Sequence, residues 1–143
     1  MTRTRFRKDE RGAALLETAI TIPLILLICV GIFEFGRAYQ TSQVLTNAAR
    51  EGARIAILAG VSDADVRTTV RGYMASGRLP NAATADVNIN RNVAMGSNSA
   101  SQITVNYPFQ FIVLNPVVRL VSPNSRTGQP LTMQAVALMR NES

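Results

Sequence analysis

The hydrophobic pattern of this chain begins with one long apolar run. Residues 13–33 contain a single charged side chain, Glu17. At about 1.5 Å per residue, a helix over this run is roughly 31 Å long, which matches the ~30 Å hydrocarbon core of a bilayer. The pattern therefore predicts a transmembrane helix, which we assign to residues 13–36.

A helical period continues beyond this span. Over residues 37–60, apolar or small side chains recur at spacings of three and four, as in an amphipathic helix. We expect one helix of about 47 residues, roughly 70 Å long, whose second half lies outside the membrane. Small residues spaced by four form a ridge on it, along which another backbone can approach closely. The ridge consists of Ala48, Gly52, Ala56 and Gly60. We favour docking of the chain's own domain there, with a partner helix as the alternative.

Pro23 lies inside the predicted span. A proline removes one helical hydrogen bond and clashes with the carbonyl of Ala19, so we expect a kink or local melting. Thr18 and Thr21 are expected to help satisfy the freed backbone groups. A proline that is merely tolerated in a membrane helix is the alternative interpretation.

A second, shorter helix is predicted after the long one. Residues 62–65 form a capping-box type of start, with acidic side chains at the positive end of the helix dipole. Its expected apolar face consists of Val66, Val70, Tyr73 and Met74. Gly77 and Pro80 end this helix, and residues 82–85 are interpreted as a linker.

The hydrophobic period then changes to two. Residues 87–93 and 103–107 alternate apolar and polar side chains on either side of a turn, which predicts an antiparallel strand pair with one solvated face. Residues 131–140 predict a third strand. The fold class is therefore α+β, with the short helix and the small sheet in residues 61–143.

Segments without a regular hydrophobic period separate the second and third strands. Residues 108–114 are ambiguous, and a continuation of the strand past a bulge is one interpretation. Residues 116–121 resemble a short helical turn that begins with an N-cap and proline. Residues 122–130 are expected to be a flexible loop.

The net charge of +6 is better explained by topology than by nucleic-acid binding. Five basic and two acidic side chains lie within residues 1–12, directly before the span. An excess of Lys and Arg marks the cytoplasmic flank of a membrane helix. We therefore expect a cytoplasmic N-terminus, an extended leader over residues 1–12, an extracytoplasmic C-terminal domain and no nucleic-acid partner.

The residues that usually carry catalysis are scarce. The chain has no histidine, and its one cysteine, Cys29, lies within the span. Asp63, Asp65 and Asp86 are explained by a helix start or a strand edge, and no phosphate loop or metal-ligand spacing occurs. We expect neither an enzyme nor a cofactor nor a metal site, and we interpret the asparagine-rich first strand as solvated.

Three separated blocks carry a family resemblance. They are residues 12–17 (GAALLE), residues 32–39 (IFEFGRAY) and residues 47–54 (NAAREGAR). In this order and spacing, the first 60 or so residues resemble the TadE-like pseudopilins of tight-adherence pilus systems. The resemblance implies cleavage by a prepilin peptidase between Gly12 and Ala13. Thr18, where major pilins of these systems commonly carry an aromatic residue, implies a minor subunit.

The acid within the span gives this resemblance a physical reason. A carboxylate at the middle of a membrane helix costs about 2.5–3.5 kcal/mol, and less towards the edge. Cleavage would leave an ammonium group on Ala13, and Glu17 would pair with that ammonium of a subunit already in the filament. The alternative is a carboxylate that reaches the water at the membrane surface.

We therefore expect a minor pseudopilin used in the assembly or priming of a tight-adherence type IV pilus or a related secretion fibre. The implied partners are a prepilin peptidase, other pseudopilins, the major pilin, an inner-membrane assembly platform and membrane lipid. The expected location is the cytoplasmic membrane, with one pass, or the extracellular pilus after assembly. The alternative function is an uncleaved, membrane-anchored extracytoplasmic binding module.

Overall fold

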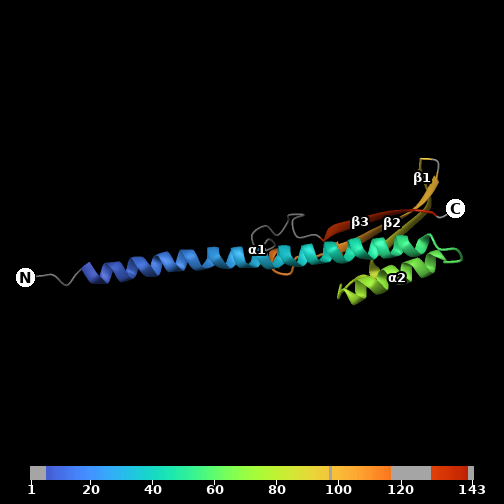
Figure 1. Cartoon of the computed structure of the whole chain (residues 1–143). Coiled ribbons are helices and arrows are strands. Elements are labelled where there is room, and N and C mark those ends of the chain that lie inside the picture. Colours follow the sequence, from blue (N-terminus) through green and yellow to red (C-terminus); the bar gives the residue numbers. More distant parts are fainter. Residues whose placement is uncertain (1–5, 97, 117–129, 142–143) are drawn as a thin grey trace, which may run out of the picture.

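The computed structural model describes residues 6–96, 98–116 and 130–141. It confirms the α+β class: a long helix packs with a shorter helix and a three-stranded antiparallel sheet (Figure 1). The elements are α1 (Phe6–Ala56), α2 (Asp63–Ser76), the 3-10 helix η1 (Ala82–Thr84), β1 (Asp86–Met95), β2 (Asn98–Phe109) and β3 (Leu131–Arg140). The helical turn and the loop expected between residues 116 and 130 lie almost entirely outside the described residues.

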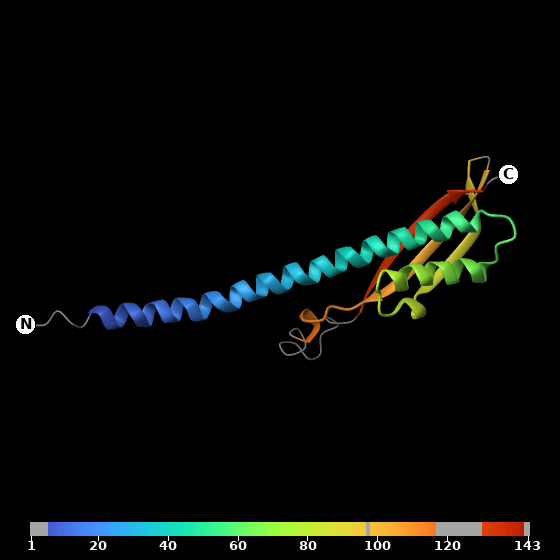
Figure 2. The ribbon, with the colours of Figure 1, turned by 60° about the horizontal axis from the view of Figure 1, so that its bottom comes forward.

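Helix α1 is continuous over 51 residues, and both of its ends differ from the prediction. It begins at Phe6, within the leader that was expected to be extended. Arg, Lys and Glu are good helix formers, and lengthening an existing helix needs no new nucleus. It ends at Ala56, because the chain turns at Gly60, whose φ of +81° lies in the left-handed region that suits glycine. Helix α2 then runs back along α1 (Figure 2).

The helix also continues through Pro23, so the local melting expected there is absent. Figure 2 shows only a gentle bend in the blue N-terminal part of α1. The hydroxyls of Thr18 and Thr21 donate to the carbonyls of Ala14 (2.8 Å) and Glu17 (2.7 Å). The expectation that they compensate for the bond lost at Pro23 was wrong, because each bonds to the carbonyl one turn before itself.

The sheet has the order β1-β2-β3, and both pairs are antiparallel. Along β2, alternate side chains from Ile103 to Phe109 are buried, while those between them are partly exposed. This alternation confirms a sheet with one face on the core. Strand β3 has the predicted limits, and β1 and β2 are longer than predicted.

The ambiguous segment over residues 108–114 is only partly strand, because β2 ends at Phe109. Pro108 and Phe109 continue β2 in unbroken register with β3, so the expected bulge is not there. The pairing of β1 with β2 ends at Asp86 and Asn106. At Pro108, β2 therefore pairs with β3 alone. Proline has no backbone N–H, and no hydrogen bond to β1 is lost because β1 does not extend this far.

The capping box at the start of α2 is confirmed. The hydroxyl of Ser62 accepts from the backbone N–H of Asp65 (3.3 Å), and the Asp65 carboxylate accepts from the backbone N–H of Ser62 (3.1 Å). The Ser62 hydroxyl and N–H hold the pKa of Asp65 below its usual value, because both bond to the charged form. Val66, Val70 and Met74 form the buried face, whereas Tyr73 is 41 % exposed and was wrongly assigned to it.

Small residues allow α1 and the domain to approach closely. Ala48, Gly52 and Ala56 of the predicted ridge are buried against the chain's own domain, but Gly60 is exposed and lies outside the helix. A Cβ atom on Gly52 would lie 2.5 Å from Cγ2 of Val70. The ridge is therefore one residue shorter than predicted, and at its glycine there is no room for a side chain beneath α2.

We predict that Gly52→Ala destabilises the domain by about 1–3 kcal/mol, because the stiff side chain of Val70 has no room to move away. In a Val70→Ala background, the same substitution should lower the free energy of unfolding clearly less, because the clashing Cγ2 atom is gone. Thermal unfolding of the detergent-solubilised protein measures both values. Gly72→Ala is the matched control: nothing lies within 4 Å of its added Cβ, so it should stabilise α2 by about 0.5–1 kcal/mol. An equal cost of Gly52→Ala in both backgrounds would contradict the contact.

Candidate functional site on the long helix

The N-terminal half of α1 extends away from the domain (Figures 1 and 2). Within the described residues, α1 is the one helix long and apolar enough to cross a membrane, and none of its most apolar stretch is buried. The exposed large apolar side chains there are Leu15, Leu16, Ile20, Ile22, Leu24, Ile25, Leu26, Leu27, Ile28, Ile32 and Phe33. So large an apolar surface in a soluble protein would mark an interaction site. Its length and composition fit a membrane anchor.

The predicted cleavage residues lie on this exposed helix. Gly12 and Ala13 are exposed and helical. Glu17 is one turn further along, on the same face as Ala13, because residues four apart are neighbours on a helix. Its carboxylate has no ion pair or hydrogen bond with another residue that the structure describes. The side chains predicted to act in assembly are therefore together at one end of α1.

A second acid on α1, Glu34, has the opposite environment. Its side chain is completely buried. One carboxylate oxygen pairs with Arg37 Nη1 at 2.9 Å, and the other accepts from the backbone N–H of Val113 at 2.5 Å. Both oxygens thus have charge-assisted partners, one from α1 and one from the segment that follows β2.

Aromatic side chains close this cluster. The guanidinium carbon of Arg37 lies 5.3 Å from the ring centre of Phe109, within the range of a cation–π contact. The ring of Phe109 meets that of Phe111 edge to face, with ring centres 5.2 Å apart. We call Glu34, Arg37, Phe109, Phe111 and Val113 the junction cluster, because they join the domain to the helix where its uncovered half begins.

The sequence prediction missed the junction cluster. It included Glu34 and Arg37 only as members of the block 32–39 (IFEFGRAY), without a role of their own. A signal was present: Glu34 stands between two phenylalanines, and Arg37 follows three residues later on the same helix face. Its partner could not be found, because Val113 is 79 residues away in the sequence.

Arg91 binds α1 at the other end of the domain. It lies where the register between β1 and β2 shifts, and its guanidinium donates to the carbonyls of Ala56 (2.6 Å) and Val61 (2.9 Å). It also pairs with the carboxylate of Asp63 at 2.8 Å. Arg91 therefore satisfies carbonyls at the end of α1 and in the turn to α2, which would otherwise lack helical partners.

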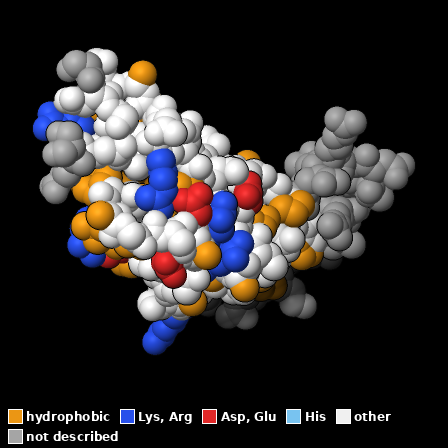
Figure 3. Space-filling model, turned by 90° about the vertical axis from the view of Figure 1, so that its right-hand side faces the viewer, with side chains coloured by type: hydrophobic (Ala, Val, Ile, Leu, Met, Phe, Trp, Pro, Cys, Tyr) orange, Lys and Arg blue, Asp and Glu red, His pale blue; other side chains and the backbone are white. Residues whose placement is uncertain are grey.

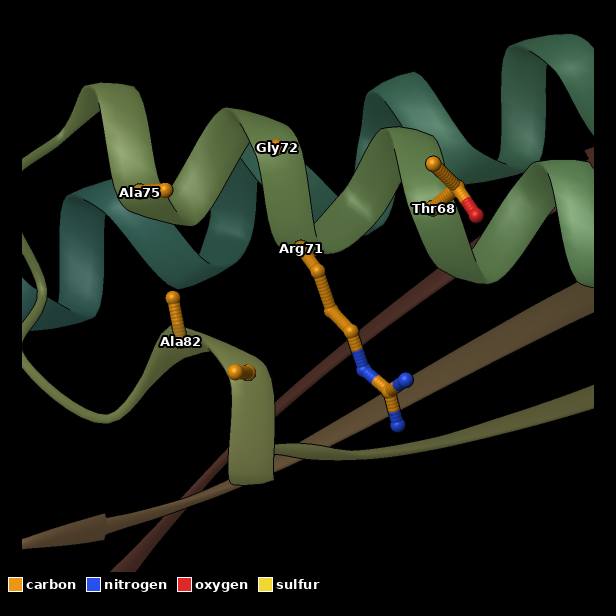
Figure 4. A pocket seen from close by; sticks show the side chains of 6 residues that line it. Thr68, Arg71, Gly72, Ala75 and Ala82 are labelled. Carbon is orange, nitrogen blue, oxygen red and sulfur yellow. The ribbon is translucent and has the colours of Figure 1, made fainter.

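Other surfaces offer less defined chemistry. A shallow hollow of about 390 Å³ between α2 and η1 is lined by Thr68, Arg71, Gly72, Ala75, Ala82 and Ala83 (Figure 4). The Arg71 side chain points towards the strands, where Nη2 donates to the carbonyl of Ala85 at 3.3 Å.

Basic and acidic side chains intermingle on the end of the domain far from the apolar helix (Figure 3). In the described part of the chain, no three His, Cys, Asp or Glu residues gather as metal ligands would.

Fold and site together define a class of protein: a small α+β domain carried on one helix of membrane-spanning length. Residues 12–54, all within α1, match the family model described as TadE-like protein. The match confirms the resemblance seen in the sequence over these residues. The domain beyond α1 lies outside the matched residues. No curated protein and no solved structure matches the chain.

We predict that Glu34→Ala releases the segment after β2 from α1. Losing a hydrogen bond to a charged acceptor costs about 1.5–3 kcal/mol, so the Val113 amide should exchange roughly 10- to 100-fold faster. Amide hydrogen exchange of the detergent-solubilised protein measures this rate. Glu51→Ala is the matched control, because Glu51 also pairs with an arginine three residues on, at 2.6 Å, but is partly exposed. Unchanged exchange at Val113 in Glu34→Ala would contradict the contact.

Proposed function

We propose that the protein is a minor pseudopilin of a tight-adherence pilus or a related secretion fibre. The observation that carries this proposal is the match to the TadE-like family over residues 12–54, which begins at the predicted cleavage glycine. The uncovered helix supports it, because a filament subunit needs an apolar helix that lipid covers before assembly and other helices cover afterwards.

In this proposal the helix crosses the cytoplasmic membrane once. The basic leader stays in the cytoplasm, following the positive-inside rule, and the α+β domain lies outside. Other pseudopilins, the major pilin and an inner-membrane assembly platform are the proposed partners. After assembly, the subunit would be part of the extracellular fibre.

A prepilin peptidase would cut between Gly12 and Ala13. The bond lies within α1, so the helix must open locally before a protease can bind it in an extended form. Gly12 supports such opening, since glycine is about 1 kcal/mol less favourable than alanine inside a helix. Among the residues that the structure describes, no atom of the domain lies within 4 Å of a Cβ atom built on Gly12.

The freed ammonium of one subunit would then pair with Glu17 of the next. In the low dielectric of a helix bundle, an unpaired carboxylate is costly and a matched ion pair reduces that cost. The pair would favour incorporation of a subunit in one axial register. The hydroxyl of Thr21 donates to the backbone carbonyl of Glu17, so this bond leaves the Glu17 carboxylate free for the proposed pair.

The uncleaved binding module stays the second candidate, because α1 is helical on both sides of Gly12. A polar row on the sheet would be its binding face: Asp86 accepts from Asn88 and Asn106, and Asn106 accepts from Gln134. An intact leader on functional protein would favour this candidate.

We predict that mature protein from membranes begins at Ala13. N-terminal sequencing together with intact mass measures this directly. Gly12→Leu should block cleavage, since the bulky side chain would replace the glycine that the peptidase pattern requires. Gly31→Leu is the matched control: both glycines have open surroundings on α1, and its leader should still be removed. Functional fibres containing the full leader would contradict the proposal.

We further predict that Glu17→Gln is cleaved normally but enters fibres at least about tenfold less, which corresponds to 1.4 kcal/mol or more of lost pairing energy. Quantitative immunoblotting of sheared fibres against membranes gives this ratio. Glu51→Gln, which removes an acid from the outer half of the same helix, should enter at close to the normal level. Equal incorporation of Glu17→Gln and wild type would contradict the assembly role.

A further inference from the structure

The uncovered half of α1 ends in a ring of exposed aromatic side chains. Phe33, Phe35 and Tyr39 are 56 %, 68 % and 68 % exposed, although each is large and mostly apolar. Tyrosine and other amphipathic aromatics are favoured at the level of the lipid headgroups. The ring lies where the long apolar run of the sequence gives way to polar residues.

The segment that follows β2 lies beside this ring. The backbone N–H of Val113 is bound to Glu34, between two of the ring residues, and Phe109 holds Arg37 on the next turn. Figure 2 shows this orange segment next to the middle of α1, at the end of the domain nearest the uncovered helix. Ile112 is 58 % exposed there.

Two features of this segment suit the edge of a membrane. Irregular backbone is tolerated near lipid where its polar groups have partners inside the protein, and Glu34 supplies one to Val113. The Glu34 side chain is completely buried and Val113 of the segment binds one of its oxygens, so the acid does not face hydrocarbon. The guanidinium of Arg37, whose side chain is 29 % exposed, is paired with Glu34 and lies over the Phe109 ring, so the positive charge beside the segment is also satisfied within the protein.

We propose that residues 111–114 form a second membrane-contacting segment, which inserts Ile112 into the interfacial layer of the outer leaflet beside Phe33, Phe35 and Tyr39. The occupant of this surface is phospholipid, because Phe33 and Phe35 lie at the end of the apolar run of the proposed span and the exposed Ile112 lies in the segment bound to Glu34 between them. The segment would fix the height and tilt of the domain above the bilayer. The inference rests on the proposed membrane anchoring of α1 and adds a second point of contact.

The test uses single cysteines labelled with the environment-sensitive fluorophore NBD in vesicles of phosphatidylcholine and phosphatidylglycerol. The native Cys29 reports the span. In a Cys29→Ser background, Ile112→Cys reports the segment, Phe35→Cys reports the interface, and Asn98→Cys reports the far end of the domain. Position 112 is exposed, so a cysteine there should not disturb the fold.

Because an interfacial residue lies about 5–10 Å into the headgroup and acyl boundary, we expect nitroxide lipids labelled near the headgroup to quench Ile112→Cys about as strongly as Phe35→Cys, and at least about twofold more than Asn98→Cys. Lipids labelled deep in the acyl chain should quench Cys29 most strongly. These two results together support the proposal.

Two other outcomes would overturn it. If Ile112→Cys behaves like Asn98→Cys while Cys29 is quenched by deep labels, the helix spans the membrane but the segment does not touch it. In that case, quenching of Ile112→Cys only by a nitroxide-labelled second copy of the chain would identify a neighbouring subunit as the occupant. If Cys29 is not quenched by deep labels either, both the contact and the proposed anchoring fail.

Discussion

One continuous helix that meets two different environments constrains the whole molecule. Along its first half, α1 exposes isoleucine, leucine and phenylalanine side chains that nothing in the described domain covers. Each Å² of apolar surface left in water costs about 25 cal/mol of free energy, so this half of the helix is unfavourable in water. Its second half presents small side chains such as Ala48 and Gly52, against which the domain packs closely. The change from large to small side chains sets where the domain sits.

Packing on alanine and glycine gives close contact but little directional preference along the helix axis. Two long polar side chains supply that direction. Arg91 binds the carbonyls at the far end of α1, and Glu34 binds the backbone N–H of Val113 at the near end. Since hydrogen bonds lose strength steeply when misaligned, the two contacts fix the position of the domain along α1.

The sequence predicted what repeats locally. The capping box of Ser62 and the limits of β3 came from short-range patterns, and the structure agrees with both. The end of α1 was missed because small residues continue the helical period to Gly60, although a left-handed glycine suits a turn better than a helix. Pro108 was ambiguous because sequence alone does not show that β1 has ended beside it.

The residues of the candidate site also fall into those that a short-range pattern predicts and those that depend on a long-range contact. The spacing of Gly12, Ala13 and Glu17 is a short-range pattern, and the sequence alone was enough to single out these residues. The junction cluster depends on a contact across 79 residues, and on the burial of Glu34 that follows from that contact. Neither has a periodic signature, so a charged residue at the end of a span could only be assigned to the flank.

Two acids on one helix have opposite surroundings, although their side chains are the same. Glu17 and Glu34 are about 25 Å apart along α1, close to the thickness of a hydrocarbon core. The carboxylate of Glu34 has partners within its own chain for both oxygens, so a neighbouring subunit would gain little by approaching it. Glu17 has no partner among the residues that the structure describes, and its cost in lipid can be reduced by a cation from another chain. The proposed pairing between subunits therefore depends on the acid that has no partner within the described part of its own chain.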